Sequence, residues 1–391
     1  MNLKELENRT ILMLGKNRAF SSDEFESQMK FHKISVNREY GDDVVVVVEG
    51  RMMSPAEQNE SETLYTQKSK QLEFVSIDVF EKELAKYIDE DTLLMSLKLS
   101  HDKVRLKSFI QNSTISDELF FKLLKMYSWS GEDFFENDDN RDVSAALILR
   151  FYKNIERNHN VQYATTGFMH LVAQTKTTQL LKVISLLEPI KFHPEIECAI
   201  AMSLYCDEEM QEHFFKKAKN PKILEALSLN ENLKSTLVKE FLKDEKLGRN
   251  VAKSIKLTDE LFELCKEQKI GLALNETLTL QMQEELLEFG DDEISYALAH
   301  NDKLNQNILN SLLQSTNKNI ISCIYANKAT PVELLENAYK NSEYYEELAK
   351  NENTPIEILY QLQLDSRYER FVKTNAGFGK HIQQESIGWE V

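Results

Sequence analysis

The chain has 391 residues and a formal net charge of −17, with 42% hydrophobic and 28% charged residues. These globular proportions exclude a collagen-like fibre and wholesale disorder. The acidic balance argues against nucleic acid as the main partner, because a face that binds phosphates needs clustered Lys and Arg, although a local basic stripe stays open.

The sequence predicts a cytoplasmic protein that does not enter a membrane. No stretch approaches the ~18 to 20 apolar residues of a membrane helix, and the start MNLKELENRT has no apolar core of a secretion signal. Four cysteines are scattered without a CxxC pair, which is typical of buried thiols in a reducing compartment. They are Cys198, Cys206, Cys265 and Cys323.

The first 90 residues alternate strands and helices. Short apolar runs predict strands at 10–14 (TILML), 34–38, 44–48 (VVVVV) and 72–76. A first helix should begin after Ser21 or Ser22 as N-cap, the polar segment 50–71 holds a weak helix, and 77–88 is amphipathic. The apolar side of that last helix should carry Val79, Phe80, Leu84 and Tyr87.

This order of elements resembles the BRCT domain, and the strongest local match is LEFVSIDVFEKEL at 72–84. His32 and Lys33 replace the family's frequent Gly-Gly. The resemblance implies a protein-interaction module. Some members hold a phosphoserine with a Ser or Thr before the first-strand glycine and a Lys early in the second helix. Those positions are Leu14 and Thr63 here, which implies docking or pairing instead. Lys68 and Lys70 are candidate substitutes, or simply solvated lysines.

A phrase recurs in the C-terminal half, where IYANKATPVELLENA at 324–338 aligns with LAKNENTPIEILYQL at 348–362. Fainter copies extend the series upstream and downstream. The spacings between successive anchors are 24, 24, 21, 26, 26, 24 and 24 residues, which predicts one supersecondary unit packed repeatedly on its neighbours. The anchor positions are Cys206, Asn230, Ser254, Asn275, Asn301, Asn327, Asn351 and Asn375.

Each unit contains two helices. Thr330, Pro331 and Glu333 predict a helix start with an N-cap, a proline in the first position and a capping box. The recurring Asn is interpreted as a turn device, because Asn tolerates the left-handed conformation that follows helix ends. A row of binding amides is the alternative interpretation.

Phrases such as NENTPIEIL resemble the variant leucine-rich repeat, an all-helical solenoid related in shape to HEAT arrays. Residues 101–124 follow the same order, with a Ser cap at Ser116, whereas 129–200 show no clear register. We expect an α+β multidomain protein that is mainly α. It would comprise a BRCT-like α/β domain at 1–90, an irregular helical region at 91–200 and an α-helical repeat solenoid with a period of about 24 at 201–391.

No phosphate-binding glycine loop, zinc spacing or nucleophile motif is present, so the sequence predicts neither an enzyme nor a cofactor or metal site. The favoured function is a scaffold or adaptor that binds a protein partner through the helical-repeat groove, the BRCT-like domain or both. The alternative is a nucleic-acid-associated protein of replication or repair, and an enzyme with an unrecognised site is a third possibility. The alternative depends on one basic cluster, which otherwise forms a solvated face: Lys216, Lys217, Lys219 and Lys222.

Overall fold

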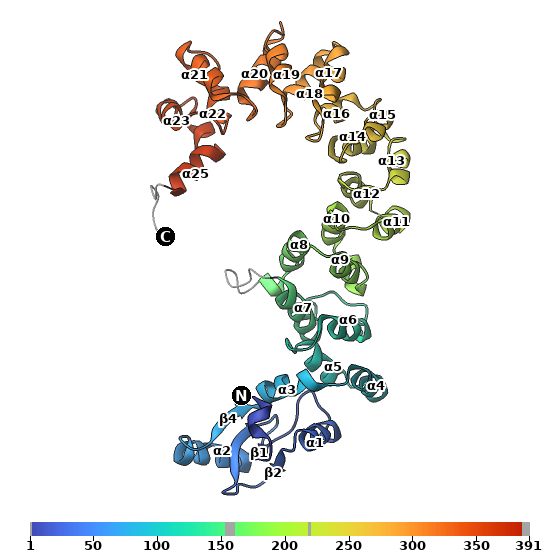
Figure 1. Ribbon diagram of the computed structural model, residues 1–391, viewed down its shortest axis with the longest axis vertical. Coiled ribbons are helices and arrows are strands. Elements are labelled where there is room, and N and C mark those ends of the chain that lie inside the picture. The colour runs from blue at the N-terminus through green and yellow to red at the C-terminus, as the bar shows by residue number, and fades with distance from the viewer. Residues whose placement is uncertain (1, 153–160, 218–219, 385–391) are drawn as a thin grey trace. The chain divides into compact units, whose positions relative to one another are not determined.

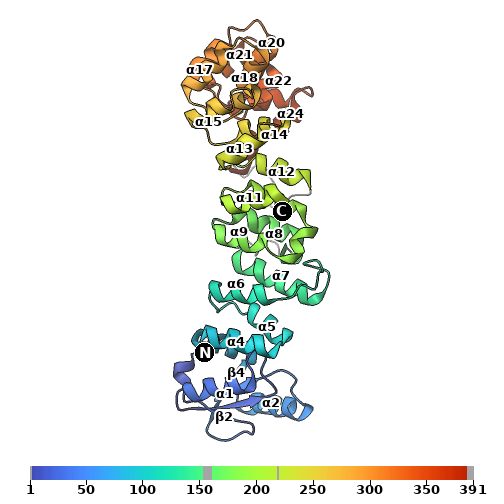
Figure 2. The same ribbon diagram turned by 90° about the vertical axis from the view of Figure 1, so that its right-hand side faces the viewer.

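A computed structural model describes residues 2–152, 161–217 and 220–384 (Figures 1 and 2). The chain forms two compact units, Met1–Ile196 and Glu197–Val391. The fold is mainly helical, with one small parallel sheet near the N-terminus. Helix α10 (Pro194–Met202) spans the boundary between the two units.

The first unit begins with a four-stranded sheet in the order β2-β1-β3-β4, and every pairing is parallel. The central strands are β1 (Thr10–Leu14) and β3 (Val44–Glu49), and the edges are β2 (Ser35–Asn37) and β4 (Glu73–Ser76). All five residues of β1 are buried, as expected for a parallel strand covered on both faces. The four predicted strands are therefore confirmed, with β2 and β4 shortened.

Three helices cover the sheet, with α2 (Pro55–Lys68) on one side and α1 (Ser22–Phe31) and α3 (Ile77–Leu84) on the other (Figure 1). Ser21 caps α1 in a capping box with Glu24, as the sequence predicts. The buried face of α3 differs from the prediction. Phe80 and Leu84 are buried, but Val79 is exposed, because the first turn buries Ile77 instead.

The described remainder of the first unit is mainly helical, and so is most of the described part of 129–200, where the sequence showed no clear register. Ser116 caps α6 by accepting a hydrogen bond from the N–H of Leu119 at 3.0 Å, as predicted. The helices are α4 (Glu90–Ser100), α5 (Lys103–Ile110), α6 (Asp117–Met126), α7 (Asp138–Phe151), α8 (Thr165–Gln174) and α9 (Thr178–Ser185).

Helices of the second unit alternate between two rows. Each even-numbered helix packs against the next even-numbered one, and together they form what we call the even row. Figure 1 shows this row on the inner side of the unit's bend. The even row comprises α12 (Pro221–Ser228), α14 (Glu245–Ser254), α16 (Lys269–Ala273), α18 (Asp292–Ala299), α20 (Lys318–Ala326), α22 (Tyr345–Lys350) and α24 (Glu369–Lys373). The odd row comprises α11 (Glu208–Lys217), α13 (Ser235–Phe241), α15 (Asp259–Leu264), α17 (Leu280–Glu288), α19 (Gln306–Leu312), α21 (Val332–Lys340), α23 (Ile356–Gln363) and α25 (Ala376–Gln384).

Six buried asparagines link successive helix pairs, and we call them the asparagine ladder. Each side-chain N–H₂ donates to two backbone carbonyl oxygens of the preceding pair, at 2.7 to 3.0 Å. Each side-chain oxygen accepts a backbone N–H two or three residues further on. The ladder consists of Asn230, Asn275, Asn301, Asn327, Asn351 and Asn375.

The ladder corrects the interpretation of the recurring Asn. Asn327 and Asn351 have φ values of −80° and −73°, so they are not left-handed turn residues. They recur at equivalent positions of the repeats because each amide supplies two donors and an acceptor to backbone groups. Those groups would otherwise be buried without partners. At Ser254, which cannot fill this role, the N–H of Lys256 instead donates to the carbonyl of Glu231 at 2.9 Å.

The predicted capping box before α21 is wrong. Pro331 is the N-cap residue of α21, and the hydroxyl of the buried Thr330 points backward and donates to the carbonyl of Ile324. Thr354 makes the equivalent bond to Leu348 at 2.7 Å. Each threonine therefore ties the second helix of a pair to the end of the first rather than capping its own helix.

Candidate binding site

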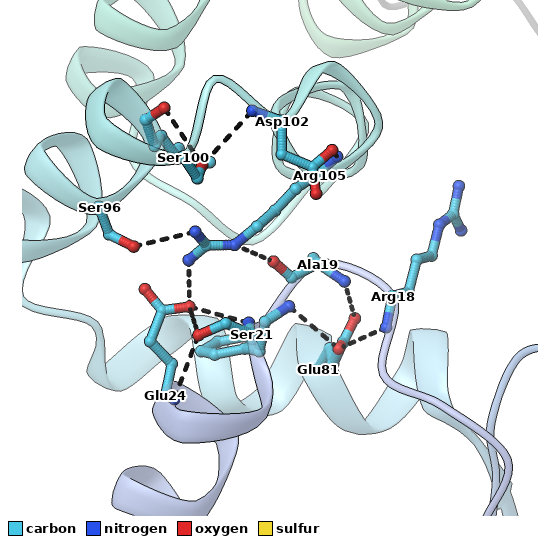
Figure 3. Close-up of polar contacts among 11 residues, drawn as sticks. Arg18, Ala19, Ser21, Glu24, Glu81, Ser96, Ser100, Asp102 and Arg105 are labelled. Atoms are coloured by element: carbon cyan, nitrogen blue, oxygen red, sulfur yellow. Dashed lines mark hydrogen bonds and ion pairs between the residues drawn. The ribbon is translucent and has the colours of Figure 1, made fainter.

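A polar cluster with two buried charges joins α1 and the segment after β1 to α3, α4 and α5 (Figure 3). The Arg105 guanidinium donates to the carbonyl of Ala19 at 2.9 Å, to the hydroxyl of Ser96 at 2.9 Å and to the carboxylate of Glu24. Nearby, the buried Glu81 carboxylate accepts the backbone N–H groups of residues 18, 19 and 20 at 2.8 to 3.2 Å. Each of the two side chains makes three hydrogen bonds to groups of the fold itself, so the cluster is a structural clamp.

The two carboxylates of this clamp respond differently to burial. Burial raises the pKa of Glu81, and the three backbone N–H groups offset only part of that effect. For Glu24 burial also acts upward, but hydrogen bonds from Ser21 and the Arg105 charge outweigh it, and the net pKa is lowered. Both carboxylates are thus held by groups of the fold itself.

The residues at the phosphate-binding positions implied by the BRCT resemblance are buried or already hydrogen-bonded within the domain. Leu14 is buried, and the hydroxyl of Thr63 donates to the carbonyl of Asn59. The Gly15 N–H that follows β1 donates to the carboxylate of Glu57 at 2.9 Å. This bond and those from Ser54 lower the pKa of Glu57 to about 2.

The candidate lysines Lys68 and Lys70 do not lie near Gly15 and Glu57. Lys68 lies at the other end of α2, roughly 16 Å along the axis from Glu57 at ~1.5 Å per residue. Its ammonium donates to the hydroxyl of Tyr40 at 2.8 Å and lies 3.7 Å from Asp42. Lys70 is exposed in the turn after α2. The structure therefore assembles no anion pocket from these residues.

The basic cluster of the second unit is divided between rows. Lys216 and Lys217 end α11 of the odd row, whereas Lys222 lies in the first turn of α12 of the even row. Lys216 is paired with Glu212 at 3.0 Å. Lys219 lies outside the described residues. The three described lysines do not form one row on the inner side.

A hollow in the even row is the candidate site. It has a volume of about 580 Å³ and lies between α16, α18 and the start of α20. Helix α16 has five residues, whereas its neighbours in the row, α14 and α18, have ten and eight. The spacing of 21 residues that ends at Asn275, just after α16, is the shortest of the series. The hollow is lined by Ile270, Leu274, Asp292, Glu293, Tyr296, Ala297, His300, Asn317 and Asn319.

A second hollow of about 380 Å³ adjoins the first and shares Ile270 and Glu293 with it. Its lining is polar, and its two cations are already engaged. Arg249 lies 3.8 Å from Glu245, and the Lys269 ammonium lies 3.8 Å from the centre of the Phe289 ring. It is lined by Glu245, Arg249, Glu267, Gln268, Lys269, Ile270, Gly271, Asp291, Glu293 and Ile294.

The two hollows together are acidic. Asp291 caps α18 by accepting the N–H groups of residues 293 and 294, and Asp292 accepts a hydrogen bond from Asn317 at 2.9 Å. Within the described part of the chain, Glu267 and Glu293 form no ion pair or side-chain hydrogen bond. These two carboxylates are therefore available to an external cation.

Tyr296 and His300 form an aromatic wall of the first hollow. Tyr296 is 44% exposed, and its ring centre lies 4.6 Å from that of His300. The Nδ1–H of His300 donates to the Tyr296 carbonyl at 2.9 Å, so Nε2 faces the Cys323 thiol at 3.5 Å. Burial raises the pKa of Cys323, which opposes formation of a thiolate nucleophile. The wall is suited to contact with a ligand rather than to covalent chemistry.

No protein-family profile, curated protein or solved structure matches the chain. Among the described residues, no group of His, Cys, Asp and Glu could hold a metal ion, and no helix is long and apolar enough to cross a membrane. Sequence reasoning identified the repeats but not the hollow. The one signal for it was the shortened spacing before Asn275.

Proposed function

We propose that the chain is a non-enzymatic cytoplasmic scaffold or adaptor that binds a protein partner through the even row of its second unit. The observation that carries this proposal is the hollow between α16, α18 and α20, in which an exposed tyrosine stands beside apolar walls. Aromatic side chains in apolar pockets are the usual anchors of protein interfaces. The hydrogen-bonded helix pairs on both sides supply a rigid support.

We also propose that the first unit contains a BRCT-like domain and that the second unit is a helical-repeat solenoid, as the two sequence resemblances imply. The parallel order β2-β1-β3-β4 supports a BRCT-like interaction domain, and the asparagine ladder supports a helical-repeat solenoid related to variant leucine-rich repeats. Because the Gly15 N–H is already bonded to Glu57, this domain would dock or pair without binding a phosphate. The even row is accordingly the principal binding surface.

The alternative, a nucleic-acid-associated protein of replication or repair, has less support. Its basic cluster is divided between α11 and α12, and the hollow of the even row is acidic where phosphate binding would need cations.

A photo-crosslinking amino acid at position 296 tests the proposal. The matched control is the same substitution at Tyr360, which is 37% exposed on the odd row against 44% for Tyr296. After irradiation in a lysate of the source cells, we expect a discrete protein adduct from position 296 and none from position 360. Purified adduct should disappear when excess unlabelled chain competes.

Two results would overturn the proposal. One is equal labelling from both positions, because that indicates random collision rather than a site. The other is an adduct from position 296 that is digested by nuclease instead of protease, because that would favour the nucleic-acid alternative. Both variants should keep the wild-type unfolding midpoint, since neither side chain is buried.

A further inference from the structure

We infer that the partner's segment carries a large apolar side chain and a Lys or Arg about three positions apart, and that it binds in an extended conformation. This inference rests on the proposed function, because it names the chemistry that the same two hollows recognise. It commits to a basic peptide segment and excludes an acidic one.

The apolar half of the motif follows from the first hollow. Ile270, Leu274 and Ala297 supply aliphatic walls, and the Tyr296 ring supplies a flat face. Its volume of about 580 Å³ holds a Trp, Phe or Leu side chain with room for the adjoining backbone. The exposed Asn319 in the first turn of α20 offers polar atoms to that backbone.

The basic half follows from the second hollow. Glu267 and Glu293 lack ion pairs within the described residues, whereas the local cations Arg249 and Lys269 are engaged with Glu245 and the Phe289 ring. A cation placed there would meet two carboxylates without displacing an existing pair. A carboxylate placed there would meet like charges, so the charge pattern sets the sign of the partner.

The spacing follows from the packing of the even row. The first hollow is lined by α16, α18 and α20 and the second by α14, α16 and α18, so the two are offset by one helix of the row. Packed helices lie ~8 to 10 Å apart, and an extended chain advances ~3.3 Å per residue. An anchor in the first hollow therefore places its basic residue about three positions along the chain.

Fluorescein-labelled Gly-Ser host peptides test this chemistry. One carries Trp and Arg three positions apart, and others carry the reverse order, Trp with Glu, or Ala with Arg. Binding to the full chain is measured by fluorescence anisotropy at low ionic strength. We expect one Trp–Arg order to bind about three- to tenfold more tightly than the Trp–Glu peptide, as two exposed charge pairs allow. The Ala–Arg peptide should be weaker by at least as much, because Ala leaves the apolar first hollow unfilled.

Protein variants locate the effect. The double variant Glu267→Gln with Glu293→Gln should remove the preference for Arg over Glu, whereas Glu284→Gln with Glu288→Gln on the exposed side of α17 should leave it unchanged. Raising the salt concentration should reduce the preference in the wild type only.

The outcomes separate this inference from the proposed function. Equal binding of the Trp–Arg and Trp–Glu peptides, or of the Ala–Arg and Trp–Arg peptides, overturns the inference and leaves the crosslinking result intact. If no peptide binds but position 296 still captures a protein, the inference fails and the proposed function stands. If position 296 also captures nothing, both fail.

Discussion

Charged side chains are buried and paired in one region of the molecule and exposed without partners in another. In the clamp between the sheet and α5, the guanidinium of Arg105 is nearly buried and contacts a carboxylate, a hydroxyl and a carbonyl. In the hollows of the even row, Glu267 and Glu293 face solvent without a charged partner among the described residues. A buried charge with hydrogen-bonded partners belongs to the fold, whereas an exposed charge without a partner beside an apolar wall is available to a ligand.

The largest effect should come from Arg105→Met. This change leaves the carbonyl of Ala19 and the carboxylate of Glu24 without their buried partner, and breaking a buried pair from one side costs about 3 to 5 kcal/mol. The free energy of unfolding can be followed in urea by far-UV circular dichroism, because both units are rich in helix.

The control for that prediction is Arg367→Met in the second unit. Arg367 also contacts a carboxylate, Asp365 at 2.6 Å, but its side chain is 72% exposed. An exposed pair contributes at most about 1 kcal/mol. If both variants lose the same stability, the distinction between the closed clamp and an exposed pair is wrong.

A smaller loss is expected from Asn301→Ala within the asparagine ladder. The carbonyls of Ala273 and Asn275 and the N–H of Lys303 would lose their partners, at a cost of about 2 to 4 kcal/mol. Asn301→Asp keeps the acceptor but sets a negative charge against two carbonyl oxygens, so it should be no better. Urea unfolding monitored by far-UV circular dichroism gives the comparison.

The matched control is Asn310→Ala, because Asn310 is exposed on α19. Its change should stay within about 0.5 kcal/mol of the wild type. A stable Asn301→Asp variant would mean that the two donated hydrogen bonds contribute little to the stability of the second unit.

Local patterns predicted what short-range physics determines. The strand at 10–14 and the caps at Ser21 and Ser116 were confirmed, because apolar runs and capping residues act on their immediate neighbours. The recurring Asn was located correctly but misinterpreted, because its carbonyl partners lie in the preceding helix pair. Arg105 was missed altogether, since its partners Ala19 and Glu24 are 86 and 81 residues away. Periodicity shows equivalent positions but does not show what each one contacts.

The smallest expected loss of stability concerns the close packing of α16 on α14 at Gly271. A Cβ on Gly271 of α16 would lie 2.6 Å from the carbonyl oxygen of Arg249 and 3.0 Å from the Cβ of Ala252, so Gly271→Ala must push α16 away from α14. Overpacking of this kind costs about 1 to 3 kcal/mol, against a gain of about 0.5 to 1 kcal/mol for replacing a helical glycine. We therefore expect a net loss in the urea unfolding of the second unit.

Gly379→Ala in α25 should instead raise the free energy of unfolding, because a Cβ there meets nothing within 4 Å. The expected gain in helix propensity is about 0.5 to 1 kcal/mol. Gly271→Ala should also weaken the Trp–Arg peptide, since Gly271 lines the second hollow beside Ile270. If Gly271→Ala is as stabilising as Gly379→Ala, α14 and α16 do not pack closely.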